Sequence, residues 1–278
     1  MRVGIATPTV FQVPGVASEW ERTASVDDLV AVARTADEVG ISHLTCAEHV
    51  AVPEEAAATR GGTYWDPLAT LSFLAAHTRR IELVTAVLVL GYHRPEAIAK
   101  RFGTLDLLSG GRLVLGVGVG SLREEFDLLG AAWDDRGARA DADLRRLREI
   151  WGRASIDGMR FDPTSPRTTV PVWVGGRTQR SLRRAVELGT GWMPFGLRRD
   201  ELAALLGRFD LPEGFEVVLS PSGTLDPLGD PDRVLSKLRA VREIGATRAT
   251  CTVDAESADH YCEQLAALAG LAEQLEDR

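Results

Sequence analysis

The chain has few cysteines, no excess of basic residues and no long apolar run. Its 278 residues contain three widely spaced cysteines, Cys46, Cys251 and Cys262, an odd number that argues against a disulfide framework. Lys and Arg number 32 against 40 Asp and Glu, a net charge of −8, which argues against a nucleic-acid-binding protein. No apolar stretch approaches the roughly 20 residues that span a bilayer, and polar residues interrupt any signal peptide. We therefore expect a cytoplasmic protein that binds neither nucleic acid nor membrane.

Patterns for metal binding and for nucleophilic catalysis are missing as well. Cys46 and His49 have the spacing of half a zinc site, but the sequence contains no second CxxC and no HxxxH,. The nucleophile elbow GxSxG is absent,. We expect no metal site.

Short apolar runs alternate with helical patterns along the whole chain. The apolar runs predict eight strands, at Val3–Val10, His43–His49, Ile81–Leu90, Leu113–Gly120, Val170–Gly176, Gly191–Phe195, Phe215–Leu219 and Ala246–Val253,. Helices are predicted at 25–40, Asp66–Thr78, Pro95–Leu108, Leu122–Leu129, Asp141–Trp151, Ser181–Leu188, Asp200–Phe209, Asp232–Ile244 and Ala258–Leu275, with a loop at Gly152–Thr169.

Eight strand–helix pairs with short connections are what a (β/α)8 TIM barrel requires. An open, doubly wound sheet also alternates but usually contains fewer units. No long linker divides the chain, so the sequence favours an α/β protein with a single TIM-barrel domain over residues 1–278.

The working residues of a barrel lie where the strands end, and the second predicted strand ends in Glu48-His49,. A histidine titrates near neutral pH, so this pair is the strongest candidate for proton transfer. The alternative is a histidine that only forms a hydrogen bond to a neighbouring helix. The role of His93, after the third strand, is left open by its position.

Two glycine-rich segments also fall at predicted strand ends. Gly116, Gly118 and Gly120 share one face of a strand, which admits either a flat ligand or close packing of another strand. Gly175-Gly176 leads into a helix N-terminus, which favours an anion site, although Gly-Gly also makes ordinary turns.

The block from Pro95 to Gly120, with Thr-Leu-Asp-Leu-Leu-Ser-Gly-Gly-Arg at its centre, resembles the bacterial luciferase-like flavin monooxygenase superfamily. Thr85-Ala86-Val87 and the segment from Pro171 to Gly176 are similar too, and the resemblance extends over nearly the whole chain. The Glu48-His49 pair, with a proline four residues on, resembles the branch that uses the deazaflavin coenzyme F-420.

This resemblance implies a homodimeric F-420-dependent oxidoreductase that moves a hydride between the deazaflavin and a small organic substrate. It implies a non-proline cis peptide between Ala86 and Val87, and His49 as the catalytic proton donor. The coenzyme-binding residues implied are Glu48, His49, Ala86, Val87, Val89, Gly118, Val119, Gly120, Ser121, Gly175, Gly176 and Thr178. The candidate substrate contacts are His93, Phe195 and Arg198.

Two other functions stay open at this point. One is an FMN-dependent monooxygenase on the same scaffold, which uses reduced flavin and O2. The other is a non-catalytic protein that binds flavin or F-420 as a carrier or sensor. The second arises because sugar-phosphate dehydrogenases of the F-420 branch have a glutamate where this chain has Ser121.

Overall fold

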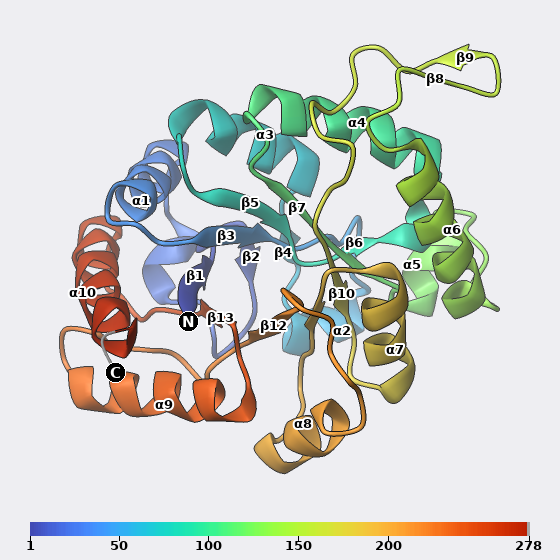
Figure 1. The fold of residues 1–278 in the computed structure, drawn as a ribbon. Helices are drawn as coiled ribbons and strands as arrows, with labels where there is room; N and C mark the ends of the chain where they lie inside the picture. Colours follow the sequence, from blue (N-terminus) through green and yellow to red (C-terminus); the bar gives the residue numbers. More distant parts are fainter. Residues whose placement is uncertain (277–278) are drawn as a thin grey trace.

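Eight parallel strands close into a barrel in the computed structural model, which describes residues 1–276 (Figure 1). Around the barrel, in order, run β1 (Arg2–Ala6), β3 (His43–Cys46), β5 (Glu82–Thr85), β7 (Leu113–Gly118), β10 (Val172–Gly175), β11 (Gly191–Met193), β12 (Glu216–Leu219) and β13 (Arg248–Cys251). Strand β13 pairs with β1, and β10 pairs with β7, so the sheet has no open edge. This confirms the predicted TIM barrel and rules out the open sheet.

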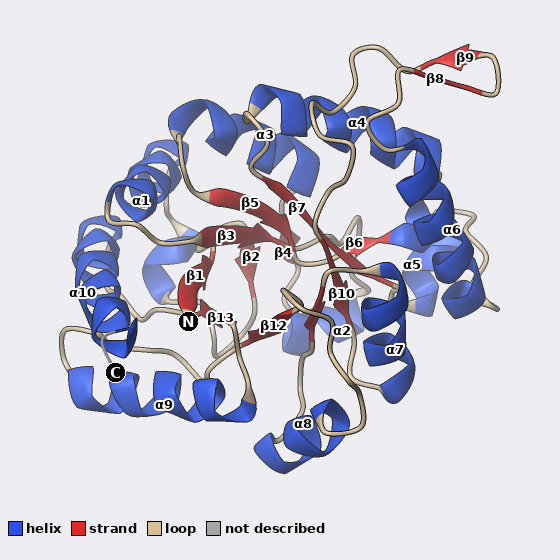
Figure 2. Cartoon of the chain, viewed as in Figure 1, coloured by secondary structure: helices blue, strands red, loops and turns tan. Residues whose placement is uncertain are grey.

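Helices surround the strands, as Figure 2 shows. They are α1 (Val26–Glu38), α2 (Glu54–Arg60), α3 (Pro67–His77), α4 (Pro95–Leu108), α5 (Arg123–Leu128), α6 (Arg136–Ile150), α7 (Gln179–Leu188), α8 (Arg199–Leu206), α9 (Pro231–Ile244) and α10 (Ala258–Glu276). Ser25 caps α1 by accepting the N–H of Asp28, while the Asp28 carboxylate accepts the N–H of Ser25,. None of these helices, within residues 1–276, is long and apolar enough to cross a membrane.

The third predicted strand differs from the structure. It is not continuous: β5 ends at Thr85, and β6 (Leu88–Val89) follows the cis peptide between Ala86 and Val87 that the resemblance implied. A 3-10 helix, η2 (Leu90–Tyr92), comes next. The second predicted strand is also too long, because β3 ends at Cys46 and leaves Glu48 and His49 in the loop beyond it.

Short elements were missed by the sequence analysis. Helix α2 and the two-residue strands β2 (Phe11–Gln12) and β4 (Thr63–Tyr64), which pair with each other, lie in loops after β1 and β3. A hairpin of β8 (Ser155–Ile156) and β9 (Met159–Arg160) falls in the predicted loop and projects from the barrel (Figure 1). Helix α6 begins at Arg136, five residues before its predicted start at Asp141.

A buried charge network closes the N-terminal end of the barrel. Arg248, at the start of β13, is 3% exposed and pairs with Glu82 and Glu216, which start β5 and β12. Its guanidinium lies 4.9 Å from the ring centroid of Trp173. His43 packs edge-on against the same ring, and burial lowers the pKa of His43 to about 3, so this histidine is neutral. Arg248 and His43 fill the barrel interior at this end, and the functional residues of TIM barrels lie at the other end, where the strands terminate.

Asp106, inside the family-like block, anchors the turn between α4 and β7. It is fully buried and accepts hydrogen bonds from Arg167 Nε, at 2.9 Å, and from Ser165 Oγ, at 2.6 Å. It also accepts the N–H of Leu113, the first residue of β7. The aspartate therefore ties a distant loop to the strand that carries the three glycines.

Candidate active site

The predicted site residues come from four strands that are neighbours in the barrel. Glu48 and His49 follow β3, Ala86 to Val89 follow β5, Gly118 to Ser121 end β7, and Gly175 to Thr178 end β10. Because all four strands are parallel, these segments lie at one end of the barrel, its mouth. The structure thus brings most of the predicted residues to one rim.

Glu48 is a buried carboxylate, and both of its oxygens have protein partners. Oε2 accepts the N–H of Val89 at 2.6 Å, and Oε1 lies 2.8 Å from Nε2 of His93. The side chain is 5% exposed, and a buried carboxylate requires such partners. Glu48 therefore fastens the β6–η2 segment to the end of β3, and His93, which the sequence left undecided, belongs to this pair.

His49 is held by a residue that the sequence analysis did not single out. Its Nδ1 lies 2.8 Å from Oε2 of Glu125, in α5. The same oxygen accepts the hydroxyl of Tyr92 at 2.7 Å, while Oε1 accepts the N–H of Val50 at 2.5 Å. The His49 ring stands edge-on to Tyr64, with 4.6 Å between centroids. No local signal could have linked Glu125 to His49, because 76 residues separate them.

The Glu125 carboxyl is ionised at neutral pH. Burial raises its pKa, but hydrogen bonds from His49, Tyr92 and the Val50 N–H outweigh burial and bring the pKa below its ordinary value,. The His49 side chain is 17% exposed, whereas that of Glu125 is fully buried. The imidazole thus lies between a buried negative charge and the open rim.

Val87 occupies the space that two of the glycines leave. A Cβ on Gly118 would lie 2.6 Å from Val87 Cγ2, and a Cβ on Gly175 would lie 2.8 Å from Val87 Cγ1. A Cβ on Gly120, where φ is +79°, would meet the Phe126 ring at 2.5 Å. These glycines are therefore required by the protein's own packing, which supports the packing alternative over clearance for a ligand.

The start of α7 carries exposed positive charge. Thr178 caps the helix by accepting the N–H of Ser181, and Gly176, with φ +128°, makes the preceding turn. Arg177 is exposed, and its guanidinium lies 6.0 Å from the ring centroid of Phe195, a side chain that is itself 60% exposed. A helix N-terminus beside an arginine is suited to an anionic group.

Two further polar candidates, Ser121 and Arg198, have partners within the protein. Ser121 accepts a hydrogen bond from Arg60 Nη1 at 3.0 Å. Arg198 precedes α8 and pairs on the surface with Asp200, at 3.0 Å. Among residues 1–276, neither forms a hydrogen bond or an ion pair with His49, whose polar partner is Glu125.

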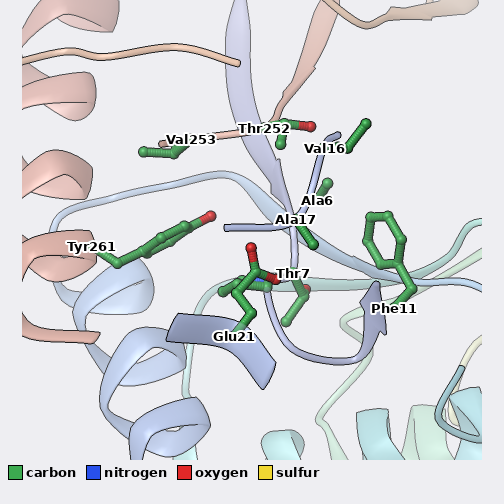
Figure 3. Close-up of a pocket in the computed structure, with 10 residues that line it drawn as sticks. Ala6, Thr7, Phe11, Val16, Ala17, Glu21, Thr252, Val253 and Tyr261 are labelled. Carbon is green, nitrogen blue, oxygen red and sulfur yellow. The ribbon is translucent and has the colours of Figure 1, made fainter. Parts of the chain in front are cut away.

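A small hollow lies on the same rim, at the ends of β1 and β13 (Figure 3). Glu21, Thr7 and Tyr261 point toward one another there, and the Thr7 and Tyr261 hydroxyls are buried without a hydrogen-bond partner in residues 1–276. The cavity volume of this hollow is about 10 Å3, roughly the space of one water molecule and far below the range of about 300–1,000 Å3 that ligand pockets usually occupy. It is too small to bury a ring coenzyme.

The half-zinc spacing does not build a metal site. Cys46 is buried, and burial raises its thiol pKa to about 12, so it stays protonated and is a poor ligand,. In the part of the chain that the structure describes, no cluster of three or more His, Cys, Asp or Glu side chains is placed to hold a metal ion.

Comparison with known proteins gives one family match. The model described as "Luciferase-like monooxygenase" matches residues 1–211. An uncharacterized protein of Mycobacterium tuberculosis is 29% identical over 200 residues, which cover 64% of this chain and 69% of the relative.

Relatives with named activities include a dehydrogenase and a monooxygenase. F420-dependent glucose-6-phosphate dehydrogenase of Amycolatopsis mediterranei is 29% identical over 180 residues, 60% of this chain and 52% of that protein. 4-Hydroxyprotoasukamycin monooxygenase of Streptomyces nodosus subsp. asukaensis is 31% identical over 175 residues, 60% of this chain and 43% of that protein. The match covers about half of each named enzyme.

Solved structures share the fold along almost the whole chain. The monooxygenase RslO1 from Streptomyces bottropensis superposes with a TM-score of 0.79 at 22% identity, covering 99% of this chain and 100% of that one. An F420-dependent secondary alcohol dehydrogenase superposes with a TM-score of 0.70 at 15% identity, covering 96% and 98%. At these identities the likeness concerns the barrel alone.

Proposed function

The chain belongs to the luciferase-like monooxygenase family and is an enzyme of this class, and we propose that it is an F-420-dependent oxidoreductase acting on a small organic substrate. The observation that carries the proposal is the His49 imidazole at the barrel mouth, partly exposed and held by a buried carboxylate. A group so placed can exchange a proton with a substrate that gains or loses a hydride. The match to F420-dependent dehydrogenases supports the choice of coenzyme.

The chemistry of the mouth fits a planar coenzyme with an anionic tail. Ala86, Val87 and Val119 are half-buried and offer an apolar surface at the ends of β5 and β7. Arg177 and the N-terminus of α7 offer positive charge at the end of β10,. When bound, the coenzyme supplies the hydride chemistry.

The residues of this chain would then position the substrate and move a proton. For a hydroxyl-bearing substrate, the oxidised coenzyme would supply the acceptor for the hydride of the C–H bond, and His49 would take the proton as the O–H bond breaks. The product would be the corresponding carbonyl compound, and in the reverse reaction His49 would return the proton to the carbonyl oxygen. Glu48 holds the β6–η2 segment beside His49 through the Val89 N–H.

A second candidate function is an FMN-dependent monooxygenase. It is favoured by the monooxygenase relative at 31% identity. FMN is also planar and anionic, so Arg177 and α7 would serve it equally.

Titration of the purified apoprotein with F-420 and with FMN separates the two candidates. We expect the Kd for F-420, measured by the fluorescence of the coenzyme, to be at least about tenfold lower than the Kd for FMN. Arg177→Ala should weaken F-420 binding, whereas Arg79→Ala should not, because Arg79 is exposed at the opposite end of the barrel, before β5. Equal affinity, or a preference for FMN, would overturn the F-420 assignment.

A further inference from the structure

Two carboxylate–histidine pairs lie next to each other at the mouth. Glu125 pairs with His49, and Glu48 pairs with His93, each at 2.8 Å. Both carboxylates are buried, with side chains 0% and 5% exposed, while the two imidazoles are 17% and 20% exposed. Tyr92, the neighbour of His93 in the chain, donates its hydroxyl to Glu125 and so joins the two pairs.

The hydrogen bonds to Glu125 decide which nitrogen of His49 carries the proton. Oε1 faces the N–H groups of Val50 and Ala51, at 2.5 and 3.3 Å, and a backbone N–H can only donate. Oε2 accepts the Tyr92 hydroxyl. A carboxylate that accepts these bonds is held in its ionised form, so it has no proton to give to His49. The bond between His49 and Glu125 therefore has Nδ1–H as its donor.

We propose that Glu125 is a positioning residue, which holds His49 in the Nδ1–H tautomer and leaves the Nε2 lone pair toward the barrel mouth. Among the described residues, no hydrogen-bond partner contacts Nε2, and the ring is fixed from the side by Tyr64. Nε2 is then the atom that receives a substrate proton, and this last step rests on the proposed function. The tautomer of His49 does not depend on the proposed function.

The backbone contacts also predict what Glu125→Gln does. The N–H groups of Val50 and Ala51 hold the amide oxygen of the new side chain at the position of Oε1. The amide NH2 then lies at the position of Oε2 and faces Nδ1 as a donor. His49 can satisfy it only by moving its own proton to Nε2, so the tautomer reverses.

Nuclear magnetic resonance of histidine-labelled apoprotein tests this directly. The His49 signals, assigned by their loss in His49→Ala, are expected to report Nδ1–H in the wild type and Nε2–H in Glu125→Gln. Two controls should keep the wild-type tautomer: Tyr92→Phe retains the carboxylate, and Glu124→Gln alters an exposed neighbour in the same helix.

An Nε2–H tautomer in the wild type, or a tautomer unchanged by Glu125→Gln, would overturn the proposal. The wild-type spectrum decides even if Glu125→Gln does not fold. Because no coenzyme is present, failure to bind F-420 would refute the proposed function and leave this result standing.

Discussion

Replacing Gly118 by alanine should destabilise the protein before any coenzyme is involved. The added Cβ would lie 2.6 Å from Val87 Cγ2, roughly 1 Å inside the usual carbon–carbon contact of about 3.5–4.0 Å. Val87 cannot rotate away freely, since its other methyl lies over Gly175, where a Cβ would be 2.8 Å distant,. Overpacking of this kind costs about 1–3 kcal/mol, and we expect Gly118→Ala to lower the free energy of unfolding by that amount.

A double-mutant cycle with Val87→Ala isolates the contact. Removing both Val87 methyls makes room for the new Cβ, so Gly118→Ala should cost less than about 0.5 kcal/mol in the Val87→Ala background. Urea unfolding, followed by tryptophan fluorescence, measures all four corners of the cycle. Gly270→Ala is the matched control: its Cβ meets nothing within 4 Å in α10, and alanine should raise stability there by up to about 1 kcal/mol.

One result would refute this reasoning. If Gly118→Ala unfolds at the wild-type urea concentration but binds coenzyme weakly, the glycine clears a path for the coenzyme, and the contact with Val87 is not limiting. A loss of stability that Val87→Ala does not relieve would mean that another neighbour resists the new Cβ.

Three further predictions concern single side chains. His49→Ala should lower turnover by about 10²–10⁴-fold while changing coenzyme affinity less; a rate within a few-fold of wild type would remove His49 from catalysis. Asp106→Ala leaves a largely buried arginine unpaired and should cost about 3 kcal/mol or more in urea unfolding, whereas Asp200→Ala, at an exposed pair, should change nothing measurable,. Burial opposes ionisation of Asp37, but backbone N–H groups at residues 79–81 outweigh it and lower its pKa. Ionised Asp37 therefore stabilises the fold fully above the pKa of an unfolded aspartate, about 3.9, and this stabilisation is lost as the pH falls through the lower pKa of Asp37 in the folded protein. Asp37→Asn should make the unfolding midpoint depend less on pH between pH 5 and pH 2.

Features with a local signal in the sequence were predictable. The strands of the barrel are short apolar runs buried on both faces, such as Leu113–Gly118, and they stand out between helices,. Ser25 and Asp28 mark the start of helix α1 in the sequence, and Pro67 at the first helical position marks the start of α3,. Eight such units in sequence leave few topologies other than a closed barrel.

Elements without a buried face could not be predicted. Helix α2 has no fully buried residue and therefore shows no apolar period,. The strands β2 and β4 contain two residues each, too few for an alternating pattern. The end of β3 was predicted three residues too late, at His49 and not at Cys46. The loop residue Glu48 is as buried as a strand residue, so burial does not change where the strand ends.

The residues of the candidate site also differ in whether the sequence could identify them. Glu48 and His49 stand at a strand end and could be found by position, whereas Glu125 enters the site from α5 through a contact that spans 76 residues. The glycines illustrate the converse case. Their spacing is evident in the sequence, but only the structure identifies Val87 and Phe126 as the groups that occupy the space beside them.

The energetics of the mouth support our proposal that its two carboxylate–histidine pairs serve proton chemistry. A buried ionic group must lose its hydration, and apolar residues of similar volume often serve a fold equally well or better. At the opposite end of the barrel, buried Arg248 pairs with Glu82 and Glu216, groups that carry fixed charges. At the mouth, the partner of fully buried Glu125 is instead the partly exposed imidazole of His49. A buried carboxylate that orients a partly exposed imidazole suits the proton transfer that we propose for His49.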